Sequence, residues 1–179
     1  ALFLVMLVYL GYYTQITSKT VINNTYNKRQ ALLESRLIRG DIRSRDGAVL
    51  ATTVSDNDGG YFRSYPYRNT FAHIVGYSTH GVLGVESMEN YTLLTCDANL
   101  ATRVRNDLAG MKKHGDNVIT TLDVTMQEAA YDAMDDRRGA VVAMNVKTGE
   151  ILCVVSKPDF DPNEIMGRWD VFNADTDNS

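Results

Sequence analysis

Two short apolar runs near the C-terminal end carry the clearest hydrophobic pattern in the chain. Residues 140–146 and 151–155 are rich in Val and Ile and too short for helices, which predicts two buried strands. The residues between the runs predict a tight turn, because Gly149 can adopt a positive φ. Pro158 follows, and proline ends a strand because it has no N–H to donate. We therefore predict a hairpin within residues 139–163.

A strand followed by an amphipathic helix is predicted immediately before this hairpin. Residues 117–122 favour a strand, and Asp123 can cap the first turn of a helix. Five apolar residues then recur at the spacing i, i+3, i+4, i+7 and i+8, which predicts one apolar helix face. These residues are Met126, Ala129, Ala130, Ala133 and Met134.

A second hairpin is predicted in the first third of the chain. Ile42 alternates with polar neighbours, Asp46 and Gly47 form a strong turn pair, and residues 49–51 begin a returning strand. Taken by themselves, these residues favour a surface hairpin with solvated charges. Residues 14–37 rise in polarity and predict a helix followed by a break.

The first 13 residues are uncharged and almost wholly apolar. They are fewer than the roughly 20 residues that a helix needs to cross a bilayer. The chain does not start with Met, however, so the run can be the outer end of a longer helix, with Tyr9, Tyr12 and Tyr13 in the interfacial aromatic belt. We expect a membrane anchor; a buried core helix and the apolar part of a signal peptide are the alternatives.

Composition excludes several classes of function. The formal net charge of −4 argues against a nucleic-acid partner, which would require a basic patch. His73, His80 and His114 have no paired ligands nearby at zinc spacing, so we expect no metal and no cofactor. Cys153 falls inside a predicted buried strand, where a small apolar residue is favoured over a disulfide with Cys96.

One long stretch resembles a known family. Residues 139–163, GAVVAMNVKTGEILCVVSKPDFDPN, are similar to the segment that opens the transpeptidase domain of class B penicillin-binding proteins, the bacterial cell-wall cross-linking enzymes. Residues 115–123, GDNVITTLD, followed by Gln127, match the same family. The resemblance implies a serine nucleophile in a Ser-x-x-Lys motif some tens of residues after residue 163. Because no serine in this chain is followed by Lys three residues later, we expect no catalytic residue here.

Two triplets have the letters of active-site motifs of this family. They are Ser55-Asp56-Asn57 and Lys147-Thr148-Gly149. Without an activated serine neither has a reaction to assist, and Lys147 falls in a hairpin turn rather than along a strand. We expect both triplets to be structural. A soluble hydrolase that uses Ser55 and Lys147 is the alternative.

Residues 39–86 resemble the pedestal domain of the same family. They contain an Arg-Gly followed by a charged turn, a Tyr-Pro followed by His-x-x-Gly, and a glycine-led glutamate that opens a short helix. A glutamate in an apolar setting needs a cationic partner, so we predict that Glu86 pairs with Arg39 or Arg45. His73 is expected to be a hydrogen-bonded structural residue. The pedestal motif residues are Arg39, Gly40, Arg45, Asp46, Gly47, His73, Gly76, Gly84 and Glu86.

The resemblance implies an α+β fold in three parts. We expect the end of a transmembrane anchor at 1–18, a pedestal or dimerisation-like domain with its linker at 19–112, and the beginning of a truncated transpeptidase domain at 113–179. The expected function is to anchor and position a catalytic domain outside the bacterial plasma membrane. Expected partners are peptidoglycan stem peptides and glycan strands, the membrane, a second copy and other cell-wall synthesis proteins. A stand-alone extracytoplasmic interaction module is the alternative.

Overall fold

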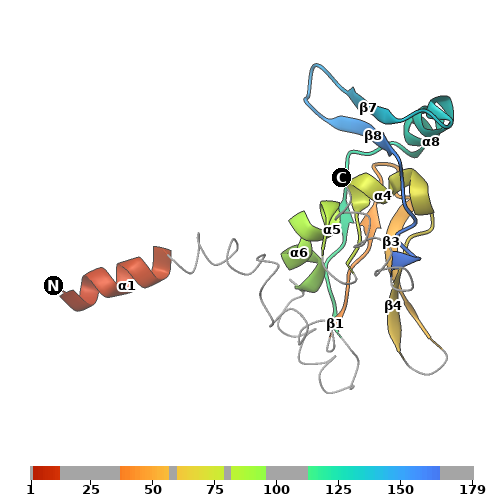
Figure 1. Cartoon of the computed structure of the whole chain (residues 1–179). Coiled ribbons are helices and arrows are strands. Elements are labelled where there is room, and N and C mark those ends of the chain that lie inside the picture. The colour runs from red at the N-terminus through yellow and green to blue at the C-terminus, as the bar shows by residue number, and fades with distance from the viewer. Residues whose placement is uncertain (1, 13–36, 57–59, 79–81, 96–112, 166–179) are drawn as a thin grey trace, which may run out of the picture.

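The chain folds into a mixed α+β structure, which Figure 1 shows as a hairpin with a helix at the top and a sheet with short helices below. The computed structural model describes residues 2–12, 37–56, 60–78, 82–95 and 113–165. We call the described residues of 37–122 the sheet unit and residues 123–157 the hairpin unit. Helix α1 (Leu2–Tyr12) precedes both in the sequence.

The sheet unit is built from short strands. β1 (Leu37–Ile38) pairs in parallel with β5 (Lys113–His114). The larger sheet has the strand order β4-β3-β2-β6, in which β2 is antiparallel to β3 and parallel to β6. Gly47 adopts a φ of 89° in the turn between β2 and β3, as the Asp-Gly pair predicts. The bounds are β2 (Ile42–Arg43), β3 (Val49–Ser55), β4 (Tyr61–Ser64) and β6 (Val118–Ile119).

Four short helices lie beside these strands and close the core of the sheet unit (Figure 1). They are η2 (Arg68–Phe71), α4 (Ala72–Val75), α5 (Gly84–Met88) and α6 (Asn90–Leu94). Buried residues of the strands, including the consecutive Leu50 and Ala51 of β3, pack together with residues of these helices. The core residues are Ile42, Leu50, Ala51, Tyr65, Phe71, Val75, Leu93 and Leu122.

Two glycines allow the main chain to cross itself beside α6. A Cβ atom on Gly115 would lie 1.8 Å from the carbonyl oxygen of Leu93, and one on Gly40 would lie 2.0 Å from that of Asp116. The close approach lets Gly40 N donate to Leu93 O at 3.0 Å and Gly115 N donate to Ile38 O at 2.8 Å. Any side chain here would force these strands apart.

The hairpin unit contains α8 (Val124–Met134), β7 (Gly139–Met144) and β8 (Ile151–Lys157). The predicted hairpin is present, because β7 and β8 pair antiparallel and Gly149 has a φ of 78° in their turn. The predicted cap is also present: the Asp123 carboxylate accepts a hydrogen bond from the Met126 amide at 3.0 Å. Cys153 is buried and carries a free thiol, as predicted.

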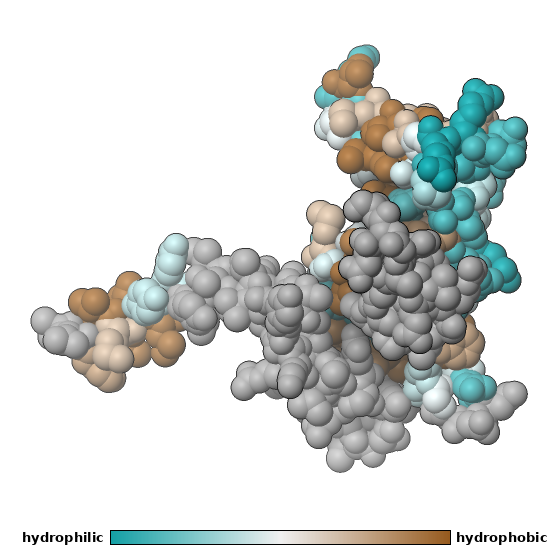
Figure 2. All heavy atoms as spheres, in the orientation of Figure 1, coloured by the Kyte–Doolittle hydropathy of each residue, from teal (hydrophilic) through white to brown (hydrophobic). Residues whose placement is uncertain are grey.

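The prediction that both strands are buried is wrong for β7. Val142 is 59% exposed and Met144 53%, and Val146 in the turn is 93% exposed. The reason is that α8 packs against β8 and leaves β7 with β8 as its neighbour within the described residues. Figure 2 shows apolar atoms gathered over this hairpin.

The predicted apolar face of α8 is confirmed in part, since Met134 is buried and Ala130 half-buried, and is wrong for its other three residues. Gln127 and Met134 are the buried residues of the helix, whereas Met126 is 39% exposed and Ala129 and Ala133 are exposed. The helix turns a polar residue inward because Gln127 finds main-chain partners there, as described below. The strand predicted at 117–122 is also shorter than expected, since β6 covers two residues.

Several predictions concern residues outside the described part. The helix predicted within residues 14–37 lies there, apart from Leu37, which begins β1. Most of the predicted linker and of the C-terminal tail lie there too, as do His80 and Cys96. Among the described residues, no helix has the length and apolar content that a membrane span requires.

Candidate functional site

A buried carboxylate lies at the centre of the sheet unit. The Glu86 side chain, on α5, is 0% exposed, and its two oxygens face two different guanidinium groups. Arg39 Nε donates to Glu86 Oε2 at 2.6 Å, and Arg63 Nε donates to Glu86 Oε1 at 2.7 Å. The predicted pairing of Glu86 with Arg39 is therefore confirmed. The predicted alternative, Arg45, does not pair with Glu86, and Arg63 from β4 provides the second charge.

Neutral groups accept further hydrogen bonds from the two arginines. Arg39 Nη1 donates to Asn90 Oδ1 at 2.6 Å, and its Nη2 donates to the Glu86 carbonyl at 2.8 Å. Arg63 Nη1 donates to the Gly40 carbonyl at 2.7 Å and to Thr53 Oγ1 at 3.1 Å. One buried carboxylate thus serves two cations, and carbonyl, amide and hydroxyl oxygens supply most of the remaining acceptors, whereas Arg63 Nη2 is buried without a hydrogen-bond partner.

Tyr65 also donates to the Glu86 carboxylate, at the same oxygen that Arg63 contacts. Its hydroxyl lies 3.3 Å from Glu86 Oε1 and accepts a hydrogen bond from Ser78 N at 3.0 Å. Burial, and then the negative charge of Glu86, raise the pKa of Tyr65. Tyr65 is therefore a neutral donor that joins the 65–78 segment to the network.

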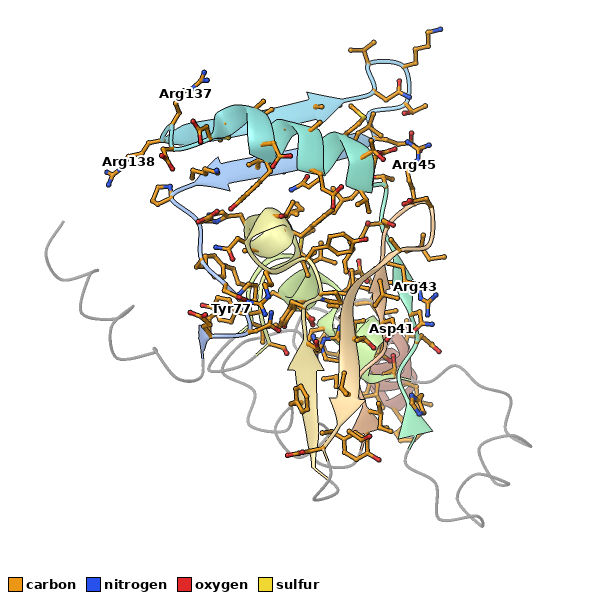
Figure 3. The ribbon with its side chains drawn as sticks, turned by 90° about the vertical axis from the view of Figure 1, so that its right-hand side faces the viewer. Asp41, Arg43, Arg45, Tyr77, Arg137 and Arg138 are labelled. Carbon is orange, nitrogen blue, oxygen red and sulfur yellow. The ribbon has the colours of Figure 1, made fainter. Side chains whose placement is uncertain are left out.

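A second charged group lies immediately before β2, an interior strand of the larger sheet. Asp41 accepts hydrogen bonds from Thr52 Oγ1 at 2.7 Å and from Arg43 Nη2 at 2.9 Å. Burial alone would raise the pKa of Asp41, but these bonds and the charges of Arg43 and Arg63 outweigh it and lower the pKa. Figure 3 shows Asp41 and Arg43 side by side, with Arg45 nearer the hairpin unit.

The comparison with known proteins agrees with this geometry. Residues 39–118, which include the whole Glu86 network, match the family described as "Penicillin binding protein A dimerisation domain". The peptidoglycan D,D-transpeptidase PbpA of Mycolicibacterium smegmatis is 37% identical over 146 residues, which are 76% of this chain and 30% of the relative. The chain belongs to the class B penicillin-binding proteins.

Solved structures of penicillin-binding proteins superpose on the same region. Penicillin-binding protein A from M. tuberculosis, in its imipenem acyl-enzyme complex, matches with a TM-score of 0.64 and 32% identity over 73% of this chain and 32% of that chain. The D,D-transpeptidase domain of a peptidoglycan glycosyltransferase from Eggerthella lenta matches with a TM-score of 0.64 and 35% identity, over 79% of this chain and 30% of that chain. This chain therefore spans about a third of the penicillin-binding proteins that it matches.

The other predicted motif residues lie around the network without touching Glu86. Asp46 Oδ1 accepts from Ser44 Oγ at 2.5 Å in the β2–β3 turn. Arg45 is exposed, and its main-chain N donates to the Leu122 carbonyl at 3.0 Å. His73 Nε2 donates to the Pro158 carbonyl at 2.9 Å, so His73 is a hydrogen-bonded structural residue.

Two more motif glycines bring α4 and α5 together. Gly76 has a φ of 79°, and a Cβ atom there would lie 2.0 Å from the Leu83 carbonyl oxygen. Gly84 has a φ of 63° and approaches the carbonyl of Ile74 in the same way. The spacing of these glycines from Glu86 places the carboxylate in the core, because the start of α5 can pack directly on the end of α4.

The two triplets that imitate catalytic motifs do not come together. Ser55 is exposed at the end of β3, whereas Lys147 is exposed in the β7–β8 turn. These two ends of the molecule are opposite one another in Figure 1. No group of three or more potential metal ligands exists among the residues that the structure describes. The two triplets therefore do not share a site in the described structure.

Four residues whose side-chain hydrogen bonds link distant parts of the chain were not predicted from the sequence. Arg63 lies in β4 beside aromatic residues, and no local sequence pattern distinguishes it from a surface arginine. Asn90 follows Glu86 by four residues, one helical turn, which is a signal that could have suggested a shared partner. The other two are Gln127 and Asn163, which join the two units.

Proposed function

We propose that this chain is the non-catalytic amino-terminal part of a peptidoglycan D,D-transpeptidase, which anchors and positions the catalytic domain. The observation that carries the proposal is the superposition on M. tuberculosis penicillin-binding protein A, which uses most of this chain and about a third of the other. The relatives bear the name peptidoglycan D,D-transpeptidase. In the described residues, the Glu86 network supplies rigidity and no catalytic group.

The sheet unit is the pedestal in this proposal, and it extends to Leu122. β5 and β6 lie after residue 112, where the sequence predicted the pedestal to end, but they pair with β1 and β2. Leu122 also belongs to the core of the sheet unit. We therefore place the start of the catalytic domain at Asp123, the cap of α8.

The exposed face of β7 supports the assignment of the hairpin unit to a larger domain. Val142 and Met144 project from it, and a strand of this composition normally packs on a second layer. We propose that further elements of a catalytic domain cover this face in the full-length protein. Because α8 packs on β8, the apolar face of β7 stays available to such elements.

We propose a location at the cell envelope, with α1 as the outer end of a membrane anchor. All the described side chains of α1 are exposed; Phe3 is 76% exposed, Val5 67% and Val8 65%. Eleven residues extend about 16 Å, roughly half of the hydrocarbon core, so α1 by itself would enter the bilayer without crossing it. The chain should float with phospholipid vesicles, and a Val5→Asp, Val8→Asp double variant should not. Equal flotation would contradict the anchor.

A chimera tests the main proposal. The matched third of M. tuberculosis penicillin-binding protein A, for which a penicillin G acyl-enzyme structure exists, is replaced by this chain. We expect fluorescent penicillin to label the chimera and not the 179-residue chain. The Glu86→Ala chimera should lose folded, labelled protein, whereas the Glu128→Ala chimera, altered at an exposed residue of α8, should not.

Two results would overturn the proposal. Labelling of the 179-residue chain would show that it holds its own nucleophile. A chimera that folds but does not react would show that this chain cannot position the catalytic domain, and would favour the stand-alone interaction module.

A further inference from the structure

Gln127 joins the two units through a fully buried side chain. Its Nε2 donates to the Val154 carbonyl on β8 and to the Thr70 carbonyl on η2, each at 2.7 Å. Its Oε1 accepts from Val154 N at 2.9 Å. The side chain is 0% exposed and uses both amide hydrogens and its oxygen. One residue of α8 thus connects a strand of the hairpin unit to a helix of the sheet unit.

Asn163 makes a second connection further along the chain. Its Oδ1 accepts from Tyr65 N at 2.9 Å, and its Nδ2 donates to the Tyr65 carbonyl at 3.0 Å. These are the two bonds that a neighbouring strand would make to one residue of a sheet edge. Asp161 orients the amide, because its Oδ1 accepts from Asn163 Nδ2 at 2.9 Å.

The segment between these connections runs along the sheet unit. Figure 1 shows the chain after β8 descending beside α4 toward β4. The Phe160 ring meets His73 edge-on at 5.1 Å between centroids and Tyr77 at 6.0 Å. Tyr77 lies beside this descending segment in Figure 3. Aromatic contacts and the His73–Pro158 bond therefore fill the space between the two amides.

Both amides bind the same short stretch of the sheet unit. Tyr65 and Thr70 lie on either side of the turn that leads from β4 into η2, while Gln127 and Asn163 reach them from two distant points of the chain. Two separated attachments restrict a rotation of the hairpin unit relative to the sheet unit that a single attachment would permit. The Gln127 attachment is buried, so removing its amide would leave the main-chain groups of Thr70 and Val154 without that partner.

We propose that Gln127 and Asn163 are positioning residues that set the angle between the hairpin unit and the sheet unit. This inference rests on the proposed function, in which the sheet unit orients the catalytic domain. Gln127 holds the near side of that domain, and Asn163 holds the segment that leaves β8.

Spin labels on the 179-residue chain test the proposal without any catalytic assay. Labels at Met88→Cys on the sheet unit and Val146→Cys on the hairpin unit, both highly exposed sites, report the distance between the units in a Cys96→Ser, Cys153→Ala background, which has no other thiol. We expect one narrow distance distribution, and loss of that single narrow peak in Gln127→Leu and in Asn163→Ala. Asn145→Ala is the matched control, because Asn145 makes its side-chain bond inside the hairpin turn.

Asn163→Ala keeps the test interpretable if Gln127→Leu does not fold, because Asn163 lies at the surface. A narrow peak retained in a folded Asn163→Ala variant, with an unchanged distance, would overturn the inference. A narrow peak together with a penicillin-reactive chimera would reject the amide connections and leave the proposed function intact. A broadened peak together with an unreactive folded chimera would support the amide connections and reject the proposed function.

Discussion

The sheet unit and the hairpin unit bury their side chains in different ways. The sheet unit surrounds an apolar core and a carboxylate that is fully enclosed by two arginines. The hairpin unit buries one side of β8 and leaves the apolar face of β7 largely exposed. Two strands of similar apolar content can therefore differ in burial, because burial depends on which other elements pack against each strand. The hairpin unit depends on neighbours, while the sheet unit encloses its own core.

The crossing of Gly40 and Gly115 should be the most sensitive point of the sheet unit. Gly115→Ala places a methyl group 1.8 Å from the Leu93 carbonyl oxygen, a clash that can be relieved only if α6 or the segment after β5 moves. We expect the free energy of unfolding to fall by more than about 4 kcal/mol, as for the largest single substitutions. Gly60→Ala is the control, since its Cβ would have Asp56 Cβ as nearest neighbour at 3.9 Å. Denaturant unfolding measures both, and similar losses would contradict the crossing.

Removal of the buried Glu86 carboxylate should have the second largest effect on stability. Glu86→Ala leaves Arg39 and Arg63 buried without their counter-ion, which costs about 3–5 kcal/mol. Glu128→Ala removes an exposed carboxylate from the hairpin unit and should change stability by less than about 0.5 kcal/mol. Thermal unfolding of the two variants compares them directly. An equally small effect of both would show that the network adds nothing to the sheet unit.

A matched pair of valines tests the asymmetry inside the hairpin unit. Val155→Thr buries a hydroxyl at a site that is 2% exposed, and should cost about 1–3 kcal/mol. Val142→Thr changes a site that is 59% exposed and should be close to neutral, because Thr keeps a high strand propensity. The two midpoints of urea unfolding give the comparison. A similar cost at both sites would mean that β7 is covered in solution.

The smallest effect should come from Asp41, and it should depend on pH. Its folded pKa is lowered, so the ionised carboxylate stabilises the sheet unit above the ordinary pKa of 3.8, and this stability is lost as the pH falls through the folded pKa. Asp41→Asn should therefore melt at a lower temperature than the native chain at neutral pH. The gap should close as the pH drops below about 3.8. A gap that is the same at every pH would point to packing instead of charge.

Sequence signals predicted both hairpins, the cap of α8 and the pairing of Glu86 with Arg39 or Arg45, of which Arg39 is the partner in the structure. These features depend on neighbouring residues or on one buried charge that must find an opposite charge. The family resemblance added the α+β fold and the expectation that catalytic residues lie elsewhere. Arg63 could not be predicted in the same way, because an arginine in an alternating strand is compatible with either face.

The sequence by itself therefore determined the turns, the pairing within the β2–β3 and β7–β8 hairpins and the chemistry of the buried charge, all of which follow from residue type and short spacing. Only the tertiary structure decided which apolar strand is covered, which face of α8 turns inward, and where Gln127 and Asn163 attach. These outcomes depend on groups far apart in the chain. Gln127 lies 57 residues from Thr70, and Asn163 lies 98 residues from Tyr65. No local pattern indicates which distant main-chain group these two amides will bind, because every residue carries a main-chain carbonyl.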